Sequence, residues 1–594
     1  MIAILSRSGL PDPALARKML AAAPHRGSCV TLRVVGNCVL GVANPPDRAG
    51  ATVSSDGPVV GALSGRLDNA AELHRVLTAA GSPPASPADA DVVVAAFRAF
   101  GPDAPNRMRG CFAGIVTDGT AAWCFRDHVG FRPLFYHDGP EVFIAASEPR
   151  QVVVGAQLPE EPDFEVLEHM LYGRMPANDP AALKGVSRLP QATTLTVNGV
   201  KGSAAQRYWH PAELLESARL TPADVRDRFV ELMGQAVARC VTGRDVITLS
   251  GGVDSPAVAA FAAPEHRRRT GRPVGALSAV FPDLPKVDER RYIELVTEHF
   301  GIQLHTYRPQ ARALDDVEQW CRLFGSPVPI LSVPEVADCY SLARRLGYEN
   351  LLTGDFAELA FGSPRHLVSH LLTHLRWRAL GRLLLTERRR GASLRTLGRH
   401  VLATFIPGRL ANWYLHWRRL DRPQRIPDWL DARKINEVPY FADLLPPSRL
   451  RWSQRQLDFE RSTITMEADE VCAARAGVTV RRPFADIDLW EFFLSLPAEL
   501  KCPDLRNKSL ARELLRGRVP DPILDRRDKT LFDEHAMTQV DYPTLKRLLV
   551  KPRHRIPGVD YRRLVQRIEQ GDVNKFDWHW AKDLARIHAF LNAW

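Results

Sequence analysis

The clearest chemical signal in this sequence is a turn that contains two adjacent glycines. Ser250-Gly-Gly-Val-Asp-Ser255 follows the β-branched run 246–249 and precedes a helical pattern that starts at Pro256. The glycines let backbone N–H groups converge without a Cβ in the way, and such a concave backbone binds anions. We expect Ser255 to cap the helix and Pro256 to take its first position. The turn is therefore predicted to hold an oxyanion.

The same turn carries an acid, Asp254, which distinguishes it from the Walker phosphate loop. The pattern G-x-x-x-x-G-K-[ST] is absent from the sequence. A carboxylate repels phosphate unless a cation lies between them, so the turn favours a bound divalent cation as well as an anion. An ordinary glycine-rich turn between a strand and a helix, without a ligand, is the alternative.

The elements that must position this turn alternate between strands and helices from about residue 220 onward. The pattern predicts a doubly wound, parallel α/β sheet with the turn at the carboxyl end of its first strand, where such sheets bind ligands. Strands are expected near 245–249, 274–280, 302–307 and 350–353, and helices near 256–263, 287–300 (ended by Gly301) and 335–346. After residue 364 the chain is predicted to be mostly helical.

Residues 1–205 follow a different pattern and are predicted to form a separate α+β layered domain. Short β-rich runs are separated by hairpin signals at 35–37, 118–119 and 138–139. Two helical patterns lie near 70–80 and 88–100. The predicted domains are thus 1–205 and 206–594.

Composition narrows the class of protein. The 594 residues are 45% apolar with a net charge of +11, and neither a signal peptide nor an apolar run long enough to span a membrane is found. We therefore expect a cytoplasmic protein without a membrane partner. Nine cysteines without a C-x-x-C pair argue against a zinc ribbon, an iron–sulfur site or a disulfide scaffold. The positive charge fits an acidic partner or a solvated basic face, and no nucleic-acid partner is predicted.

Several motifs in one order resemble the asparagine synthetase class of the ATP-pyrophosphatase superfamily. The turn at 250–255 is similar to that superfamily's pyrophosphate loop. The other similar segments are Arg207-Tyr-Trp209, Ser278-Ala-Val280, the run from Thr353 to Gly362, Arg482-Pro-Phe-Ala-Asp486, the run from Leu496 to Lys501, Lys508, and Arg526-Arg-Asp-Lys529.

This resemblance implies ATP and Mg²⁺ as cofactors and assigns roles to individual residues. Nucleotide and pyrophosphate binding fall to Ser250, Gly251, Gly252, Asp254, Ser255, Val280, Thr353 and Gly354. Asp254 and Glu358 would hold Mg²⁺, although the family usually has Asp at the second position. Lys508 and Lys529 would place positive charge on the phosphates and the tetrahedral oxyanion. Asp355 would orient or deprotonate the attacking amine.

The first domain resembles the glutaminase domain of the same class, but with its nucleophile missing. The similar segments are His25-Arg-Gly27, 63–69, 125–136 and 146–148. Working glutaminases of this type have a cysteine after the initiator methionine, whereas this sequence has Ile2, and Ser64 replaces an oxyanion-hole Asn. Ile has no nucleophilic atom. We therefore predict a degenerate amidotransferase-like domain, and the resemblance implies an αββα arrangement for it.

Without ammonia released from glutamine by the first domain, the attacking amine is expected to belong to a bound substrate, which points to cyclisation. Both β-lactam synthetases and lasso peptide cyclases take this route. Segment 364–465 is predicted to be a helical, Arg/Trp-rich insert that either grips a peptide or packs as a lid; its tryptophans are Trp377, Trp413, Trp417 and Trp429.

The sequence therefore predicts an ATP-dependent lasso peptide cyclase. It would activate an Asp or Glu side chain of a precursor peptide as an acyl-adenylate, which the core peptide's N-terminal amine then attacks. A leader peptidase and a leader-peptide-binding protein are the expected partners. The alternative enzyme is a small-molecule β-lactam or amide synthetase. An RNA-modifying ATP pyrophosphatase and an inactive binding scaffold are the alternatives from other classes.

Overall fold

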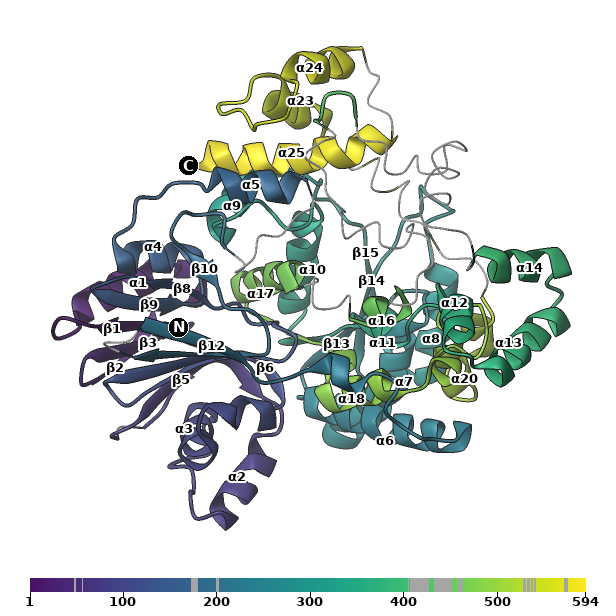
Figure 1. The fold of residues 1–594 in the computed structure, drawn as a ribbon, viewed down its shortest axis with the longest axis horizontal. Coiled ribbons are helices and arrows are strands. Elements are labelled where there is room, and N and C mark those ends of the chain that lie inside the picture. The colour runs from purple at the N-terminus through teal and green to yellow at the C-terminus, as the bar shows by residue number, and fades with distance from the viewer. Residues whose placement is uncertain are drawn as a thin grey trace.

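Three β-sheets organise the chain, two in the N-terminal part and one in the C-terminal part (Figure 1). The computed structural model describes residues 1–47, 50–55, 57–172, 180–198, 202–403, 405, 427–431, 451–457, 463–526, 530, 535, 538, 541–570 and 575–594.

The N-terminal part consists of two six-stranded antiparallel sheets with helices outside them. The first sheet has the order β10 (Ser187–Arg188), β8 (Phe135–Asp138), β9 (Val142–Ala146), β1 (Ile2–Ser6), β3 (Cys38–Asn44), β2 (Cys29–Val35). The second has the order β12 (Gly202–Arg207), β11 (Thr193–Asn198), β7 (Ala121–Arg126), β6 (Gly110–Thr117), β5 (Val60–Leu67), β4 (Ala51–Val53). All three predicted hairpin turns are confirmed, since they join β2 to β3, β6 to β7 and β8 to β9.

Helices cover the outer faces of both sheets, which confirms the αββα arrangement expected of an amidotransferase-like domain. On the first sheet lie α1 (Pro13–Ala21) and α4 (Pro149–Ala156); on the second lies α3 (Asp89–Phe100), with α2 (Ala70–Ala79) packed against it. The side chains of strand β1 explain why a helix covers one face of its sheet and the other sheet covers the opposite face. Its side chains alternate, so that Ile2 and Ile4 pack toward α1, whereas Ala3 and Leu5 pack between the sheets.

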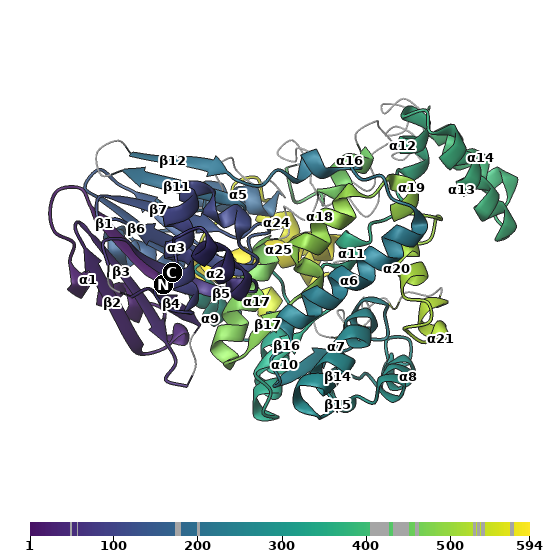
Figure 2. The same cartoon turned by 90° about the horizontal axis from the view of Figure 1, so that it is seen from below.

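The C-terminal part contains the predicted parallel sheet, with helices on both sides (Figure 2). Its order is β15 (Gln303–Tyr307), β14 (Gly275–Ala279), β13 (Asp245–Thr248), β16 (Asn350–Leu352), β17 (Thr479–Arg481). All four neighbouring pairs are parallel. The predicted strands and helices of this domain are all present, and Gly301 ends α8 with a φ of +63°.

The helices of this part follow in chain order. They are α6 (Pro222–Cys240), α7 (Asp254–Thr270), α8 (Arg290–Phe300), α9 (Val317–Phe324), α10 (Val333–Arg345), α11 (Ala357–Ala360), α12 (Leu367–Thr373), α13 (Trp377–Arg389), α14 (Leu394–Ala403), α16 (Arg451–Gln456), α17 (Thr463–Ala476), α18 (Ile487–Ser495), α19 (Ala498–Lys501), α20 (Ser509–Leu514), α21 (Asp521–Leu524), α23 (Tyr542–Val550), α24 (Tyr561–Glu569) and α25 (Lys575–Ala593). A further helix, α5 (Phe164–Leu171), precedes β10, and short 3-10 turns span Pro24–Arg26, Gly101–Arg107, Pro211–Leu214 and Pro483–Ala485.

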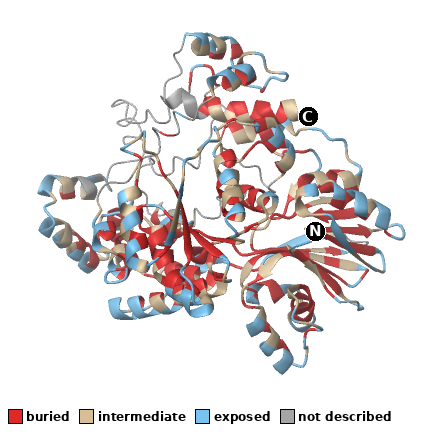
Figure 3. Cartoon of the chain, turned by 180° about the vertical axis from the view of Figure 1, so that it is seen from behind, coloured by how far each residue is buried: buried red, intermediate tan, exposed pale blue. Residues whose placement is uncertain are grey.

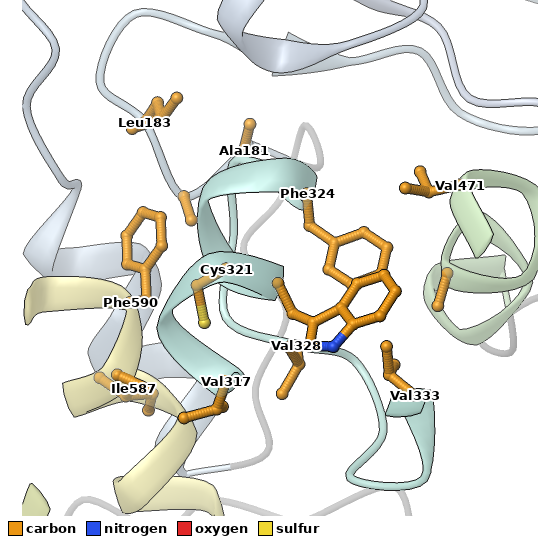
Figure 4. Close-up of a cluster of buried hydrophobic side chains, with 14 of the residues drawn as sticks. Ala181, Leu183, Val317, Cys321, Phe324, Val328, Val333, Val471, Ile587 and Phe590 are labelled. Atoms are coloured by element: carbon orange, nitrogen blue, oxygen red, sulfur yellow. The ribbon is translucent and has the colours of Figure 1, made fainter. Parts of the chain in front are cut away.

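A shared apolar core joins the two parts. Figure 4 shows α9 between the C-terminal helix α25 and helix α17, with Phe324 of α9 and Phe590 of α25 among the buried side chains. Ala181 and Leu183, from the N-terminal part, belong to the same cluster. Buried residues accordingly run through all three sheets (Figure 3). Among the described residues, no helix has the length and apolarity needed to span a membrane.

Candidate active site

The glycine turn lies where the order of the parallel sheet reverses. From β13 the chain builds outward to β14 and β15, then returns to the other side of β13 with β16. Loops at such a switch point diverge and leave a crevice at the carboxyl ends of the strands. The structure thus places the turn at the position predicted for ligand binding.

The start of α7 differs from the prediction. The helix begins at Asp254, its N-cap is Val253, and Pro256 occupies the third helical position rather than the first. A proline is tolerated there because the first N–H groups of a helix have no intrahelical acceptor. The Ser255 hydroxyl does not cap the helix; its Oγ accepts a hydrogen bond from the Ser250 backbone N–H at 2.9 Å. Ser255 therefore ties the two ends of the turn together.

An ion pair behind the turn fixes its backbone. The Gly251 N–H donates to Glu289 Oε2 at 2.9 Å, and Arg526 Nη1 donates to both Gly251 O and Glu289 Oε1 at 2.8 Å. The Arg526 guanidinium also lies over the Tyr292 ring, 4.2 Å from its centroid. Sequence reasoning missed Glu289 because it belongs to no motif and contacts the turn only through the fold.

Two glycines are required by close approach of the backbone. A Cβ on Gly251 would come within 2.9 Å of the Cβ atoms of Glu289 and Tyr292. A Cβ on Gly354 would lie 2.7 Å from the Ser255 backbone N and 2.8 Å from the carbonyl carbon of Asp254. The loops after β13 and β16 therefore meet directly, and this narrow cradle fits the phosphates of a nucleotide.

The charged groups of this cradle are Asp254 and Lys508. Their side chains form an ion pair, Lys508 Nζ with Asp254 Oδ2. Glu358 is exposed in the first turn of α11. Within the described ranges, no group of three or more His, Cys, Asp and Glu side chains could hold a metal ion. Mg²⁺ at Asp254 and Glu358 would thus depend on phosphate oxygens as further ligands, which suits an ion that keeps few protein ligands.

The loop after β16 presents the candidate base. The Thr353 hydroxyl donates to Asp355 Oδ2 at 2.7 Å, and Arg482 Nε lies 3.5 Å from the same oxygen. The Asp355 side chain remains 47% exposed, whereas Arg482 is fully buried. Asp355 is therefore accessible to a substrate but restrained from behind.

A pocket of about 350 Å³ opens beside the turn at the carboxyl ends of β13, β14 and β15. Its lining is mostly apolar and includes Leu249, Ser250, Ala279, Phe281 and Tyr307. Val280, the predicted adenine contact, adjoins this lining and is held by a hydrogen bond from its N–H to the Tyr307 carbonyl at 2.9 Å. The size and apolar character of the pocket suit a purine base.

The remaining predicted residues differ in whether the structure describes them and in how exposed they are. Lys529, Trp413 and Trp417 lie outside the described residues. Trp377 is 59% exposed at the start of α13, whereas Trp429 is only 1% exposed. The expectation that Trp429 belongs to a peptide-gripping surface is therefore wrong, because its indole packs in the shared core.

A small cavity, of about 50 Å³, lies between the amidotransferase-like domain and α17. Ser64, Arg132 and Glu470 are among its lining residues, and no cysteine is among those described there. Ile2 is fully buried on the α1 side of its sheet and does not line this cavity. Glu148 accepts hydrogen bonds from His25 Nε2 at 3.1 Å and from Arg26 Nε at 2.7 Å.

Comparison with known protein families agrees with this geometry. Residues 228–590 match asparagine synthase, and residues 2–209 match the glutamine amidotransferase domain. The chain belongs to the asparagine synthase family. It is accordingly an ATP-dependent ligase that forms carbon–nitrogen bonds, as its motifs predicted.

Its relatives include both amide and lactam synthetases. Asparagine synthetase [glutamine-hydrolyzing] 3 of Bacillus subtilis (strain 168) is 24% identical over 492 residues, covering 78% of this chain and 74% of that protein. Carboxyethyl-arginine beta-lactam-synthase of Streptomyces clavuligerus is 29% identical over 258 residues, covering 43% of this chain and 45% of that protein. A putative asparagine synthetase [glutamine-hydrolyzing] of Mycobacterium tuberculosis (strain ATCC 25618 / H37Rv) is 24% identical over 491 residues, covering 78% and 73%.

Proposed function

We propose that this ligase closes a macrolactam on a precursor peptide, as a lasso peptide cyclase does. The acid is an Asp or Glu side chain of the peptide and the amine is the N-terminus of its core. A leader peptidase would expose that amine, and a leader-peptide-binding protein would deliver the peptide.

The observation that carries this proposal is the altered amidotransferase-like domain. Ile2 supplies no nucleophile, and the cavity at Ser64 and Arg132 is about 50 Å³. A domain that releases no ammonia from glutamine leaves the ligase without its own nitrogen source. An amine on the substrate itself then completes the reaction, and a ring is the product when acid and amine belong to one molecule.

The proposed reaction has two steps. The carboxylate oxygen attacks the α-phosphorus of ATP, pyrophosphate leaves, and the acyl-adenylate forms. The amine then attacks the acyl carbon, loses a proton, and expels AMP as the amide forms. Asp254 and Glu358 would hold Mg²⁺, and the bound ion would supply positive charge that stabilises pyrophosphate as a leaving group.

Different residues of this chain would act in the two steps. The turn would bind pyrophosphate through the Gly252 N–H and the hydroxyls of Ser250 and Ser255, and Lys508 would add positive charge beside them. Asp355, exposed at the end of β16, would accept the proton of the amine. Lys529 would stabilise the tetrahedral oxyanion by its positive charge.

Support for a peptide substrate comes from the helices α13 and α14. They project from the edge of the C-terminal part, and much of their surface is exposed (Figures 2 and 3). Trp377 and Leu385 are 59% and 60% exposed on α13, and Arg378 and Arg382 are exposed beside them. Aromatic and Arg side chains dominate the binding energy of many protein interfaces.

A small β-lactam or amide synthetase is the second candidate, and the similarity to the Streptomyces β-lactam synthase favours it. The deciding experiment gives purified protein ATP, Mg²⁺ and either a short precursor peptide encoded beside the gene, with its leader removed, or free β-amino acids. Loss of one water from the peptide, read by mass spectrometry with AMP release, is the expected result. Faster cyclisation of a β-amino acid than of any peptide would replace the macrolactam proposal by the small-lactam function.

A double variant tests the peptide contact directly. Trp377→Ala with Arg378→Ala should weaken peptide processing by about 2 kcal/mol or more, the scale of aromatic and Arg hot spots, with ATP affinity unchanged. Tyr542→Ala is the matched control, since this residue is 55% exposed on α23, away from α13 in Figure 1. Equal peptide processing by the double variant and wild type would remove α13 from the substrate site.

A further inference from the structure

A fully buried arginine lies directly behind the candidate base. Arg482 follows β17 and has no exposed side-chain surface. Its Nη2 donates to Asp469 Oδ2 at 2.6 Å. Its Nε faces Asp355 Oδ2 at 3.5 Å, and its Nη1 faces Glu470 Oε1 at 3.7 Å; neither atom makes a hydrogen bond within the described part of the chain. One guanidinium thus connects three carboxylates from two elements.

The network continues into the amidotransferase-like domain. The second oxygen of Glu470 pairs with Arg132 Nη1 at 2.7 Å, and the Glu470 side chain is only 3% exposed. Arg132 lines the small cavity beside Ser64. A continuous series of charges therefore runs from the former glutaminase pocket through Glu470 of α17 and Arg482 to Asp355, across the domain boundary.

Because the side chains of this series are charged, the placement of each one depends on the charges of its neighbours. Two guanidinium groups, Arg132 and Arg482, face three carboxylates, Asp355, Asp469 and Glu470. Burial raises the pKa of Asp469, and Asp355 and Glu470 raise it further, while Arg482 lowers it. Losing one cation would leave buried negative charge without compensation, so the remaining guanidinium would be drawn toward the acids of α17.

From this arrangement we infer that Arg482 is a positioning residue for Asp355, and that Arg132 of the amidotransferase-like domain keeps Arg482 in place through Glu470. The domain that lost glutaminase chemistry thereby takes part in the amine step of the synthetase. This inference rests on the proposed role of Asp355, and it holds for a peptide or a small substrate alike.

The variant that tests it is Arg132→Gln, with Arg188→Gln as its matched control. Arg188 Nε pairs with Glu467 Oε1 at 2.9 Å, across the same boundary and on the same helix α17. Glu467 keeps a second arginine, Arg126, just as Glu470 keeps Arg482. Both variants therefore break one of two pairs to a buried glutamate, but only Arg132 belongs to the series that ends at Asp355.

The first readout needs no substrate. Wild type and variants are treated with a water-soluble carbodiimide and glycine ethyl ester, and amidation of Asp355 is measured by peptide mass spectrometry. Arg132→Gln should raise the labelling of Asp355 several-fold, because a carboxylate no longer held against Arg482 is more accessible to the carbodiimide. Arg188→Gln should not. Unchanged labelling in Arg132→Gln, or an equal rise in both variants, would overturn the inference whatever the substrate proves to be.

The second readout separates the amine step from the adenylate step. With the acid that wild type converts, amide formation is compared with trapping of the acyl-adenylate by hydroxylamine, which attacks the acyl carbon, expels AMP and leaves a hydroxamate. Hydroxylamine is largely unprotonated at neutral pH and needs no base. Arg132→Gln should slow amide formation by ~10-fold or more, consistent with a displaced catalytic group, and leave hydroxamate formation unchanged. Arg132→Lys, which keeps the charge, should recover most of the rate. A parallel loss of both products would mean a general structural role and refute the inference.

Discussion

Replacing Gly354 by alanine is the most direct test of how the two phosphate loops are built. The added Cβ would lie 2.7 Å from the Ser255 N, 2.8 Å from the Asp254 carbonyl carbon and 3.0 Å from the Asp254 Cβ. Two of these atoms belong to the backbone of the first turn of α7, so no side-chain rotation relieves the overlap. Either the loop after β13 or the loop after β16 must move.

The size of the effect follows from the overlap. Ordinary contacts to a Cβ begin at 3.4 Å, so the backbone must shift by roughly 0.7 Å to accept the new methyl group. Overpacking of this kind costs about 1–3 kcal/mol of stability. A displacement approaching 1 Å at reacting groups lowers a rate by up to ~100-fold. AMP formation by Gly354→Ala should therefore fall by ~10- to ~100-fold.

The assay measures AMP formation and the thermal midpoint of unfolding for Gly354→Ala and for a control, Gly234→Ala. A Cβ on Gly234, inside α6, meets no atom within 4 Å. Alanine there should stabilise the protein by about 0.5–1 kcal/mol and leave AMP formation unchanged. Normal AMP formation by Gly354→Ala would show that the two loops do not need their close contact, and the cradle described above would be refuted.

Three further outcomes are expected. Purified protein given glutamine should release glutamate only at the rate of a control without enzyme, because Ile2 has no nucleophilic atom; clear release would restore a glutaminase function. Asp254→Ala should abolish AMP and pyrophosphate formation while the fold stays intact, and a folded variant with a normal rate would exclude Asp254 as a metal ligand. Burial raises the pKa of Glu148, but Arg26 and His25 lower it more, from 4.5 to about 2. The ionised carboxylate therefore stabilises the fold at neutral pH, and this contribution fades as the pH falls from about 5 toward 2. Glu148→Gln should cost about 3 kcal/mol at pH 7 and much less at pH 3, measured as thermal midpoints, whereas an equal loss at both pH values would contradict this origin.

Local sequence was sufficient to predict the strands, the turns and the anion site. The short apolar runs of β13, β14 and β16, and the glycines that end α8 and join the hairpins, act over a few neighbouring residues. The turn at 250–255 is equally local, since its glycines and serines contact one another and the start of α7. Patterns that extend over so few residues can be recognised in the sequence alone. Even here the start of α7 was misplaced by two residues, because the Ser255 hydroxyl bonds back into the turn.

Only the tertiary structure decided which distant groups support the site. Glu289 and Arg526 are 237 residues apart, yet they hold one glycine between them. Arg132 and Arg482 act on Glu470 from opposite sides of a domain boundary. Trp429 carries the same indole as Trp377, but one is buried in the shared core and the other faces solvent. A side chain's type fixes what it can do, whereas its partners and exposure depend on contacts between elements far apart in sequence. These contacts arise only when the sheets and helices pack together.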